Sequence, residues 1–495
     1  MLPLSFFSFN LLSDHLLLLA SVLVFFAILI TKVGARFGAP SLLLFLLLGM
    51  VVGADGIGLK FEDYEIAESI GHFAMTIILF TGGLETSLRE TKPVLRQGLL
   101  LSTLGVLLTA ILTGMFAFLV CGKWIGPLGA TFMGCFLLTA VMSSTDSASV
   151  FSVLHGKHAK LRENLGPMLE LESGSNDPMA YVLTIILVQV LTSTKHTGTW
   201  SMIGTGAWVL VVQILVGFII GVGVGYGAKW ILKKVSLPSN ALYSILILSI
   251  GFFANGIASL LYGNGLLSLY VAAIIIGNNL NIPQKRDIFK FFDGMTWLMQ
   301  LLMFLMLGLL ARPSQFSNIV WPALLIGLFM MLVARPLSVF LCLAPFKGIS
   351  FKAKLLTSWV GLKGAGPILF ALCPVVAGMD GATEIFNIVF FISILSLLMQ
   401  GMTLSHAAKW MNLSYEDDPE VEAFGMEIPD EMGMLRDHTV SEEDLGQGDT
   451  LRDLSLPHGI RVVMVKREDR FLVPHGSMTL LPGDHLIIIM GDSDD

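Results

Sequence analysis

Long apolar runs, separated by short polar breaks, fill the chain from near its start to about residue 411. Many of these runs are long enough to cross the roughly 30 Å hydrocarbon core of a bilayer as helices. The runs predict thirteen spans, at about residues 12–32, 40–55, 67–83, 97–121, 128–155, 163–193, 202–232, 240–261, 264–282, 288–311, 319–345, 352–378 and 384–410. The pattern therefore predicts an all-α polytopic membrane domain over residues 1–411.

Two of the predicted spans are interrupted near their middle. The fifth contains "FLLTAVMSSTDSASVFSVL" and the twelfth contains "LLTSWVGLKGAGPILFALC". If the seventh span is a linker, each flanking half has six spans, and the interruption falls fifth in each half. Matching interruptions are typical of inverted repeats with a binding site near the middle of the membrane. The glycines alone would also fit close helix packing.

The composition changes after residue 411. The remainder carries 20 Asp and Glu residues against 6 Lys and Arg residues. We predict an acidic, solvated linker over residues 412–440. Beyond it, "IRVVMV" and "HLIIIM" alternate as strands do, and "LPGDH" is typical of a turn. These patterns predict a small α+β domain over residues 441–495.

The overall formal charge of −7 is the sum of two opposite regions, because the tail contributes −14 and the membrane part +7. If the N-terminus lies outside, the inside loops carry 18 Lys and Arg residues and the outside loops carry 4. Cytoplasmic loops of membrane proteins have this excess. We therefore predict an odd number of spans, an outside (periplasmic) N-terminus and a cytoplasmic C-terminus.

Five ionisable residues lie well inside predicted spans, namely Asp146, Glu172, Asp177, Arg335 and Lys363. Each is a functional candidate, because a charge in the bilayer costs roughly 2.5–3.5 kcal/mol or more. A broken helix exposes N–H groups on one half and C=O groups on the other, and Asp146 and Lys363 suit the compensation of these ends. Thr145 and Ser147 beside Asp146 add oxygen ligands for a monovalent cation.

The segment "ESGSNDPMAY" holds two acids whose environments differ. Glu172 and Asn176 are four residues apart and share a helix face, whereas Asp177 diverges from Glu172 by about 140°. We expect Glu172 to form a structural ion pair with Arg335. Asp177 is then left to hold either a proton or a cation, but not both. That competition suffices for exchange, and one proton for one monovalent cation is electroneutral.

Four motifs, "SSTDSASV", "ESGSNDPMAY", "LVARPLSV" and "GLKGAGPI", together resemble the cation:proton antiporter-1 family. Within it the chain is most similar to the NhaP-type potassium/proton antiporters of Gram-negative bacteria, over essentially its whole length. The resemblance implies crossing broken helices, a homodimer and a bacterial inner membrane. It also implies that Asp177 exchanges ions and that Glu172 pairs with Arg335. The cation-binding residues that it implies are Asp146, Thr145, Ser173 and Asn176, of which Asn176 marks the electroneutral branch.

The chain departs from the family at two positions. Ser147 stands where the family usually has Pro after the Thr-Asp pair, and Lys363 stands where it usually has Arg. Lys is a compact charge that loses its proton more readily than Arg when it is buried. The charge state of Lys363 is therefore left open by the sequence.

The tail resembles a TrkA-C (RCK_C) domain, a ligand-sensing module of potassium channels and transporters. The resemblance implies regulation by a nucleotide or a similar small ligand, although the tail shows no phosphate-cradling motif. An assembly element without a ligand is the alternative.

These observations predict a potassium (or sodium)/proton antiporter that works by alternating access, and not an enzyme. Sodium preference is the main alternative. A potassium channel would need a filter such as TVGYG, which the sequence lacks. An intramembrane aspartyl protease could use Asp146 and Asp177, but no Gly-x-Gly-Asp occurs within a span. We expect monovalent cations, protons and the bilayer as partners, no nucleic acid, no cofactor and no metal beyond the transported cation.

Overall fold

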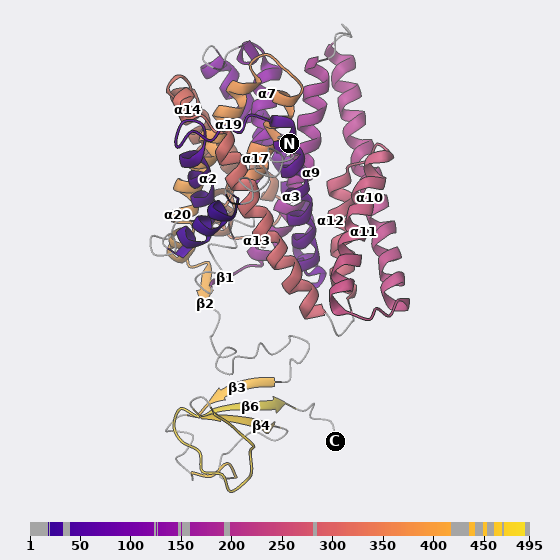
Figure 1. Cartoon of the computed structure of the whole chain (residues 1–495), viewed down its shortest axis with the longest axis vertical. Coiled ribbons are helices and arrows are strands. Elements are labelled where there is room, and N and C mark those ends of the chain that lie inside the picture. The colour runs from indigo at the N-terminus through magenta and orange to yellow at the C-terminus, as the bar shows by residue number, and fades with distance from the viewer. Residues whose placement is uncertain are drawn as a thin grey trace, which may run out of the picture. The chain divides into compact units, whose positions relative to one another are not determined.

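The computed structural model describes residues 18, 20–32, 40–122, 125, 127–146, 150, 159–192, 199–280, 285–416, 435–440, 449–452, 460–467 and 470–490. The chain divides into two compact units, Met1–Tyr415 and Glu416–Asp495 (Figure 1). The first unit is helical and the second contains a β-sheet.

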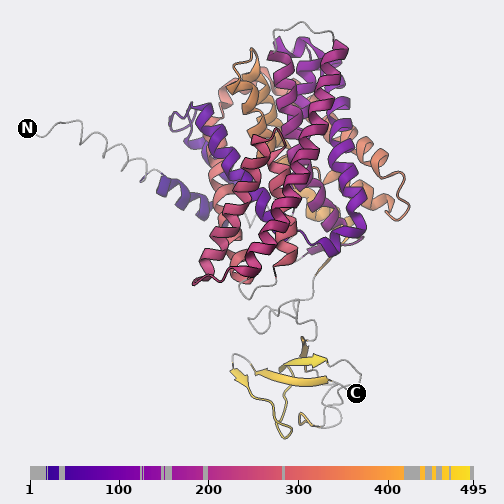
Figure 2. The same ribbon diagram turned by 90° about the vertical axis from the view of Figure 1, so that its right-hand side faces the viewer.

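The first unit is built from long helices, which pack side by side (Figures 1 and 2). They are α3 (Tyr64–Glu85), α9 (Leu165–Thr192), α10 (Thr199–Lys234), α11 (Asn240–Leu260) and α13 (Lys285–Leu310), with the composite helices Leu88–Val120, Val320–Leu343 and Ala382–Trp410. Among the described residues, all of these except α9 form a set of seven that are long and apolar enough to cross a membrane. The acidic residues of α9 lower its hydropathy, although it has 28 residues. The chain is therefore a polytopic membrane protein.

The composite helices contain π-helical turns. Leu88–Val120 contains α4 (Leu88–Thr91), η1 (Lys92–Val94), α5 (Leu95–Leu100), η2 (Leu101–Gly105), α6 (Val106–Phe116) and most of η3 (Ala117–Cys121). Val320–Leu343 comprises α14 (Val320–Phe329), η7 (Met330–Ala334) and α15 (Arg335–Leu343). Ala382–Trp410 comprises α19 (Ala382–Ser396), η8 (Leu397–Gly401) and α20 (Met402–Trp410). The first of them begins at Leu88 and not near residue 97 as predicted, because its first turns carry basic residues that the apolar pattern excludes.

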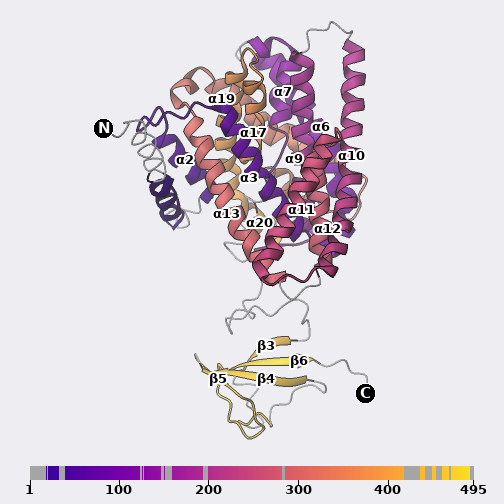
Figure 3. The same cartoon turned by 45° about the vertical axis from the view of Figure 1, so that its right-hand side comes forward.

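Shorter helices complete the unit. They are residues 20–32, α2 (Ser41–Val52), α7 (Phe132–Val141), α12 (Gly265–Asn279), α16 (Phe351–Trp359), α17 (Ala365–Phe370) and α18 (Leu372–Val376). The helices α10, α11 and α12 form a group beside α3 and α9 (Figure 3). Gly49 of α2 faces Gly308 of α13 so closely that a Cβ on Gly49 would lie 2.3 Å from the Leu305 carbonyl oxygen. Small residues permit such close helix contacts in membranes.

The two predicted interruptions are present as breaks in the helices. After α7 ends at Val141, residues 142–146 are not helical, and helix is found again at residue 150. After α16 ends at Trp359, residues 360–364 are not helical, and α17 begins at Ala365. Ser147 and the other residues between 146 and 150 lie outside the described part of the chain.

Among the described residues, strands occur in two places. β1 (Ala159–Leu161) and β2 (Ser414–Glu416) form a two-stranded sheet. The second unit holds an antiparallel sheet in the order β3-β6-β4-β5, with β3 (Leu435–Thr439), β4 (Ile460–Arg467), β5 (Arg470–Leu472) and β6 (His485–Met490). The two strands predicted from alternation are confirmed as β4 and β6. β3 lies in the stretch predicted as a linker, because its polar sequence "LRDHT" gives no apolar alternation.

The described part of the second unit has a small apolar core and a buried acid. Val465, Leu480 and Leu486 lie in the core. Asp484, which is 2% exposed, accepts bonds of 2.8 and 2.7 Å from the Arg467 guanidinium. It also accepts a bond of 2.8 Å from the Leu481 N–H. The ion pair thus joins the end of β4 to the turn before β6.

Candidate ion-binding site

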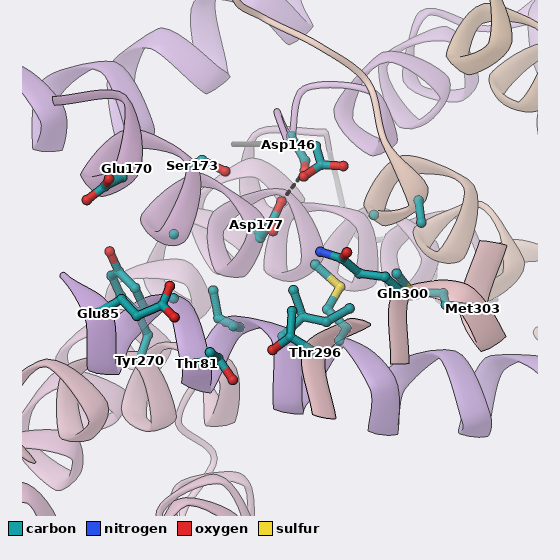
Figure 4. Close-up of a pocket in the computed structure, with 18 of the residues that line it drawn as sticks. Thr81, Glu85, Asp146, Glu170, Ser173, Asp177, Tyr270, Thr296, Gln300 and Met303 are labelled. Atoms are coloured by element: carbon teal, nitrogen blue, oxygen red, sulfur yellow. Dashed lines mark hydrogen bonds between the residues drawn. The ribbon is translucent and has the colours of Figure 1, made fainter. Parts of the chain in front are cut away.

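A cavity of about 510 Å³ lies between α3, α9 and α13 and reaches the first helix break and the start of α17, which follows the second break (Figure 4). Its inner end is lined by Ser144 and Asp146 of the first break, Asp177 of α9, and Ala365 and Gly366 of α17. Its other lining residues include acids from three helices, namely Glu85, the last residue of α3, Glu170, near the start of α9, and Asp293 of α13. The cavity therefore connects three acids to the region where the two breaks cross.

The two breaks contact each other directly. The Asp146 N–H donates a 2.9 Å bond to the Leu362 carbonyl. The Lys363 ammonium, which is 2% exposed, donates a 2.8 Å bond to the Ser144 carbonyl. Carbonyl groups just beyond the end of α7 receive no hydrogen bond from a following helical turn. A cation placed beside them, as the Lys363 side chain is, compensates the negative end of the helix dipole. A Cβ on Gly364 would lie 1.8 Å from Asp146 Oδ2, so only glycine fits beside this carboxylate.

Asp177 lies at the inner end of the cavity and is only partly buried. The Ser144 hydroxyl donates a hydrogen bond to Asp177 Oδ1, which links the sixth predicted span to the first break (Figure 4). Pro178 follows inside α9 and has no N–H to donate to the Gly174 carbonyl. Gly174 itself lines the cavity. A carboxylate, a hydroxyl and backbone oxygens are thus close together, and hard cations prefer such oxygen ligands.

Three further predicted ligands lie at the first break, but they do not all line the cavity. Ser173 lines it and donates a 2.7 Å bond to the Thr145 carbonyl. Asn176 donates a 2.5 Å bond to the Thr145 hydroxyl and accepts a 3.3 Å bond from the Thr145 N–H. Thr145 and Asn176 are buried and are not among the lining residues. In this conformation Thr145 and Asn176 join the break to α9 through hydrogen bonds. Asp146, Ser173 and Asp177 instead line the cavity.

Glu172 and Arg335 form a buried ion pair away from the cavity. Arg335 Nη2 donates to Glu172 Oε1, and the two side chains are 4% and 1% exposed, respectively. Arg335 follows the π-helical turn η7. A Cβ on Gly361 would lie 3.0 Å from Arg335 Nε, so the pair packs against the second break. The expected pairing is therefore present in the fold, and it connects α9 and α15 to the backbone of the other break.

Sequence reasoning missed the acids of the cavity and several polar residues beside them. Glu85 lies just beyond a predicted span, and Glu170 and Asp293 lie near span ends, where charge is ordinary. The spacing held a signal, because Asp293, Thr296 and Gln300 fall on one face of α13. All three line the cavity, and the buried Thr296 Oγ1 has no hydrogen-bond partner among the described residues. Ser144 gave no signal in the sequence, because an uncharged serine is common inside membrane helices.

Comparisons with known proteins agree with this geometry. The transmembrane sodium/hydrogen exchanger family matches residues 21–410, and the TrkA-C domain matches residues 438–494. The K(+)/H(+) antiporter NhaP2 of Shewanella sp. (strain ANA-3) is 37% identical over 479 residues, which cover 95% of this chain and 80% of the relative. The K(+)/H(+) antiporter NhaP of Alkalimonas amylolytica is 36% identical over 467 residues, or 93% of this chain and 75% of the relative.

A solved structure has a similar fold. The sodium proton antiporter MjNhaP1 from Methanocaldococcus jannaschii matches with a TM-score of 0.65 at 22% sequence identity. The match covers 81% of this chain and 98% of that protein.

Proposed function

This chain belongs to the sodium/hydrogen exchanger family, which is a family of transporters and not of enzymes, and from that membership we propose that it exchanges potassium for protons. The single observation that carries the site assignment is the position of Asp177 at the inner end of the cavity, beside the crossing of the two breaks. A carboxylate there can be reached by ions and is held by a neighbouring hydroxyl.

Asp177 is the exchanging residue in this proposal. A bound proton or a bound monovalent cation neutralises it, and the loaded site then crosses between the two sides of the membrane. The empty, charged site resists that movement because a charge in the membrane is costly. One proton for one cation makes the cycle electroneutral. Asp146 and Ser173 complete the site on the cavity side, while Thr145 and Asn176 set its shape from behind.

Lys363 and Asp146 compensate the helix ends at the crossing, and Glu172 with Arg335 supports the crossing without binding the ion. Lys363 donates a hydrogen bond to the Ser144 carbonyl, and its charged form would strengthen that bond. We propose thirteen spans in two inverted six-helix repeats that carry one break each, since the two breaks are the features that such repeats share.

Potassium is proposed over sodium because relatives at 36–37% identity are K(+)/H(+) antiporters. The sodium proton antiporter with the similar fold is only 22% identical and supports the fold alone. Sodium preference stays the alternative, because both ions take the same oxygen ligands and differ in the cavity size that suits them.

We propose a bacterial inner membrane, an outside N-terminus and a cytoplasmic tail, on the strength of the loop charges and the bacterial relatives. With this orientation the acids Glu85, Glu170 and Asp293 lie toward the cytoplasm, and we propose that the cavity opens to that side. We further propose a homodimer whose TrkA-C domain, residues 441–495 after the linker 412–440, adjusts exchange when it binds a small ligand such as a nucleotide.

Proton movement in everted membrane vesicles tests the proposal. Potassium and then sodium are added at several pH values to vesicles that contain wild type, Asp177→Asn, or the matched control Asp380→Asn outside the cavity. We expect potassium to collapse the pH gradient with wild type and the control, but not with Asp177→Asn. Wild-type exchange of sodium alone would reverse the ion assignment, and exchange by Asp177→Asn at the wild-type rate would refute the site.

A further inference from the structure

The last membrane helix, Ala382–Trp410, is hydrogen-bonded to both ends of the second break. The Lys363 N–H donates a 2.9 Å bond to the Ser396 hydroxyl. Ser396 in turn donates a 2.6 Å bond to Gln400 Oε1. Gln400 Nε2 then donates a 3.0 Å bond to the Trp359 carbonyl. These three bonds bridge the non-helical segment from one end to the other.

Two of these bonds satisfy backbone groups that the break leaves free. Trp359 is the last residue of α16, so its carbonyl has no donor from a following helical turn. Lys363 precedes α17, and its N–H has no helical acceptor. The Lys363 bond is buried and the Trp359 bond is partly buried, and an unpaired backbone group in such surroundings is costly. The Ser396 hydroxyl accepts the bond from the Lys363 N–H and donates to Gln400 at the same time. We call these three hydrogen bonds, which run from Lys363 through Ser396 and Gln400 to Trp359, the relay.

The backbone of the last helix is shaped for this contact. Ser396 ends α19, and Gln400 lies in the π-helical turn η8. The side chains are 0% and 1% exposed. A π-helical turn inserts an extra residue into a helix and is frequently found at functional sites. Here Gln400 lies in the turn, and Ser396 is the residue directly before it.

The held segment is also the one that contacts the ion site. Leu362, inside it, accepts the bond from the Asp146 N–H. Lys363, at its end, holds the Ser144 carbonyl, and the Ser144 hydroxyl binds Asp177. A shift of the segment would therefore move Asp146 and Ser144, which both line the cavity beside Asp177. Because packing transmits small displacements, the position of the segment matters for ion binding.

We propose that Gln400 and Ser396 are positioning residues for ion exchange, which set the location of the second break and so of Asp146 and Lys363. They touch neither the cavity nor the transported ion. The inference rests on the proposed exchange at Asp177, and it goes beyond it by assigning a role to the last membrane helix.

Serine at residue 393 provides a matched control, because it lies on the same helix α19 and is 1% exposed. Its hydroxyl has no hydrogen-bond partner among the described residues. Loss of that hydroxyl removes the same atom from the same helix without touching the break. A difference between Ser396→Ala and Ser393→Ala therefore isolates the relay from general packing.

The experiment measures potassium/proton exchange in everted vesicles with Ser396→Ala, Gln400→Met, the double variant, Ser393→Ala and wild type at equal transporter abundance. We expect the apparent KM for potassium to rise about three- to tenfold in both single relay variants, as for the loss of one or two hydrogen bonds. We also expect the pH profile to move. The double variant should be no worse than the more affected single variant, because both changes break one relay.

A purely structural role would reduce transporter abundance but leave the KM and the pH profile of the remaining molecules unchanged. Relay variants that match wild type and Ser393→Ala in both quantities would overturn the proposal. So would an additive double variant. If Gln400→Met does not reach the membrane, Ser396→Ala, which loses a single oxygen atom, decides the question. Absence of exchange by wild type with either potassium or sodium would instead refute the proposed function, and with it this inference.

Discussion

The N–H of Asp146 is hydrogen-bonded to the carbonyl of Leu362 over 2.9 Å, so the two helix breaks meet backbone to backbone. Asp146 is one partner of this bond, and Lys363 is the residue that follows the other partner, Leu362. Because backbone groups form this contact, the crossing depends on how closely the two non-helical segments can approach each other. The size of the side chains around it therefore controls the geometry of the ion site.

Alanine in place of Gly364 should abolish exchange. The added Cβ would lie 1.8 Å from Asp146 Oδ2, a distance that forces the carboxylate or the break to move. We expect a loss of about 100-fold or more in exchange rate, since a misplacement of about 1 Å can cost that much. Vesicle assays at equal abundance provide the measurement. Gly166→Ala on α9 is the control, because a Cβ there meets nothing within 4 Å.

The membrane domain and both breaks could be predicted from the sequence because each depends on local composition. Apolar runs give spans, and Gly, Pro and polar residues in mid-span give breaks. The ion pair between Glu172 and Arg335 was predictable for a different reason, since charges inside a membrane need partners and few were available. Helix ends such as Leu88 were less predictable, because basic residues in a first turn resemble a loop.

The shape of the cavity could not be predicted, because it depends on which helix faces meet. Glu85, Glu170 and Asp293 come from three helices and gather only in the fold. The same is true of Thr145 and Asn176, which were expected as cation ligands but bond each other behind the cavity wall. β3 could not be predicted for a related reason. Its own sequence lacks apolar alternation, and only its pairing with the apolar strand β6 makes it a strand.

Separate removal of either partner of the Glu172–Arg335 pair should destabilise the protein more than removal of both. An unpaired buried charge costs about 3–5 kcal/mol, whereas replacement of a whole pair by uncharged groups is often nearly neutral. We expect Glu172→Gln and Arg335→Met to lower the melting temperature of the purified protein in detergent. The double variant should recover most of that loss. Equal melting temperatures for the wild type and both single variants would show that the pair contributes nothing to stability.

Neutralisation of the cavity acids should weaken cation capture without stopping exchange. Glu85→Gln and Asp293→Asn each remove one negative charge from the cavity lining, and clefts of one charge sign concentrate counter-ions. We expect the apparent KM for the cation to rise about two- to fivefold, and the difference to shrink at high ionic strength because salt screens the effect. Glu384→Gln, on α19 and outside the lining, is the matched control. A complete loss of exchange would instead place these acids in the ion-exchange step itself.

The Arg467–Asp484 pair should make the stability of the second unit depend on pH only in acid. Burial alone would raise the pKa of Asp484, but the bonds from Arg467 and the Leu481 N–H outweigh it, so this pKa lies below its usual value. The stabilisation is therefore complete above the unfolded-state pKa of about 3.9 and is lost as the pH falls through the lower folded-state value. Hydrogen exchange of the β4 and β6 amides in the full-length protein should report no change in protection from pH 8 to 5 and a loss of it below about pH 4. Asp484→Asn should lower protection by about 1–3 kcal/mol at neutral pH and remove the acid step, whereas an acid step that persists in this variant would assign it to another carboxylate.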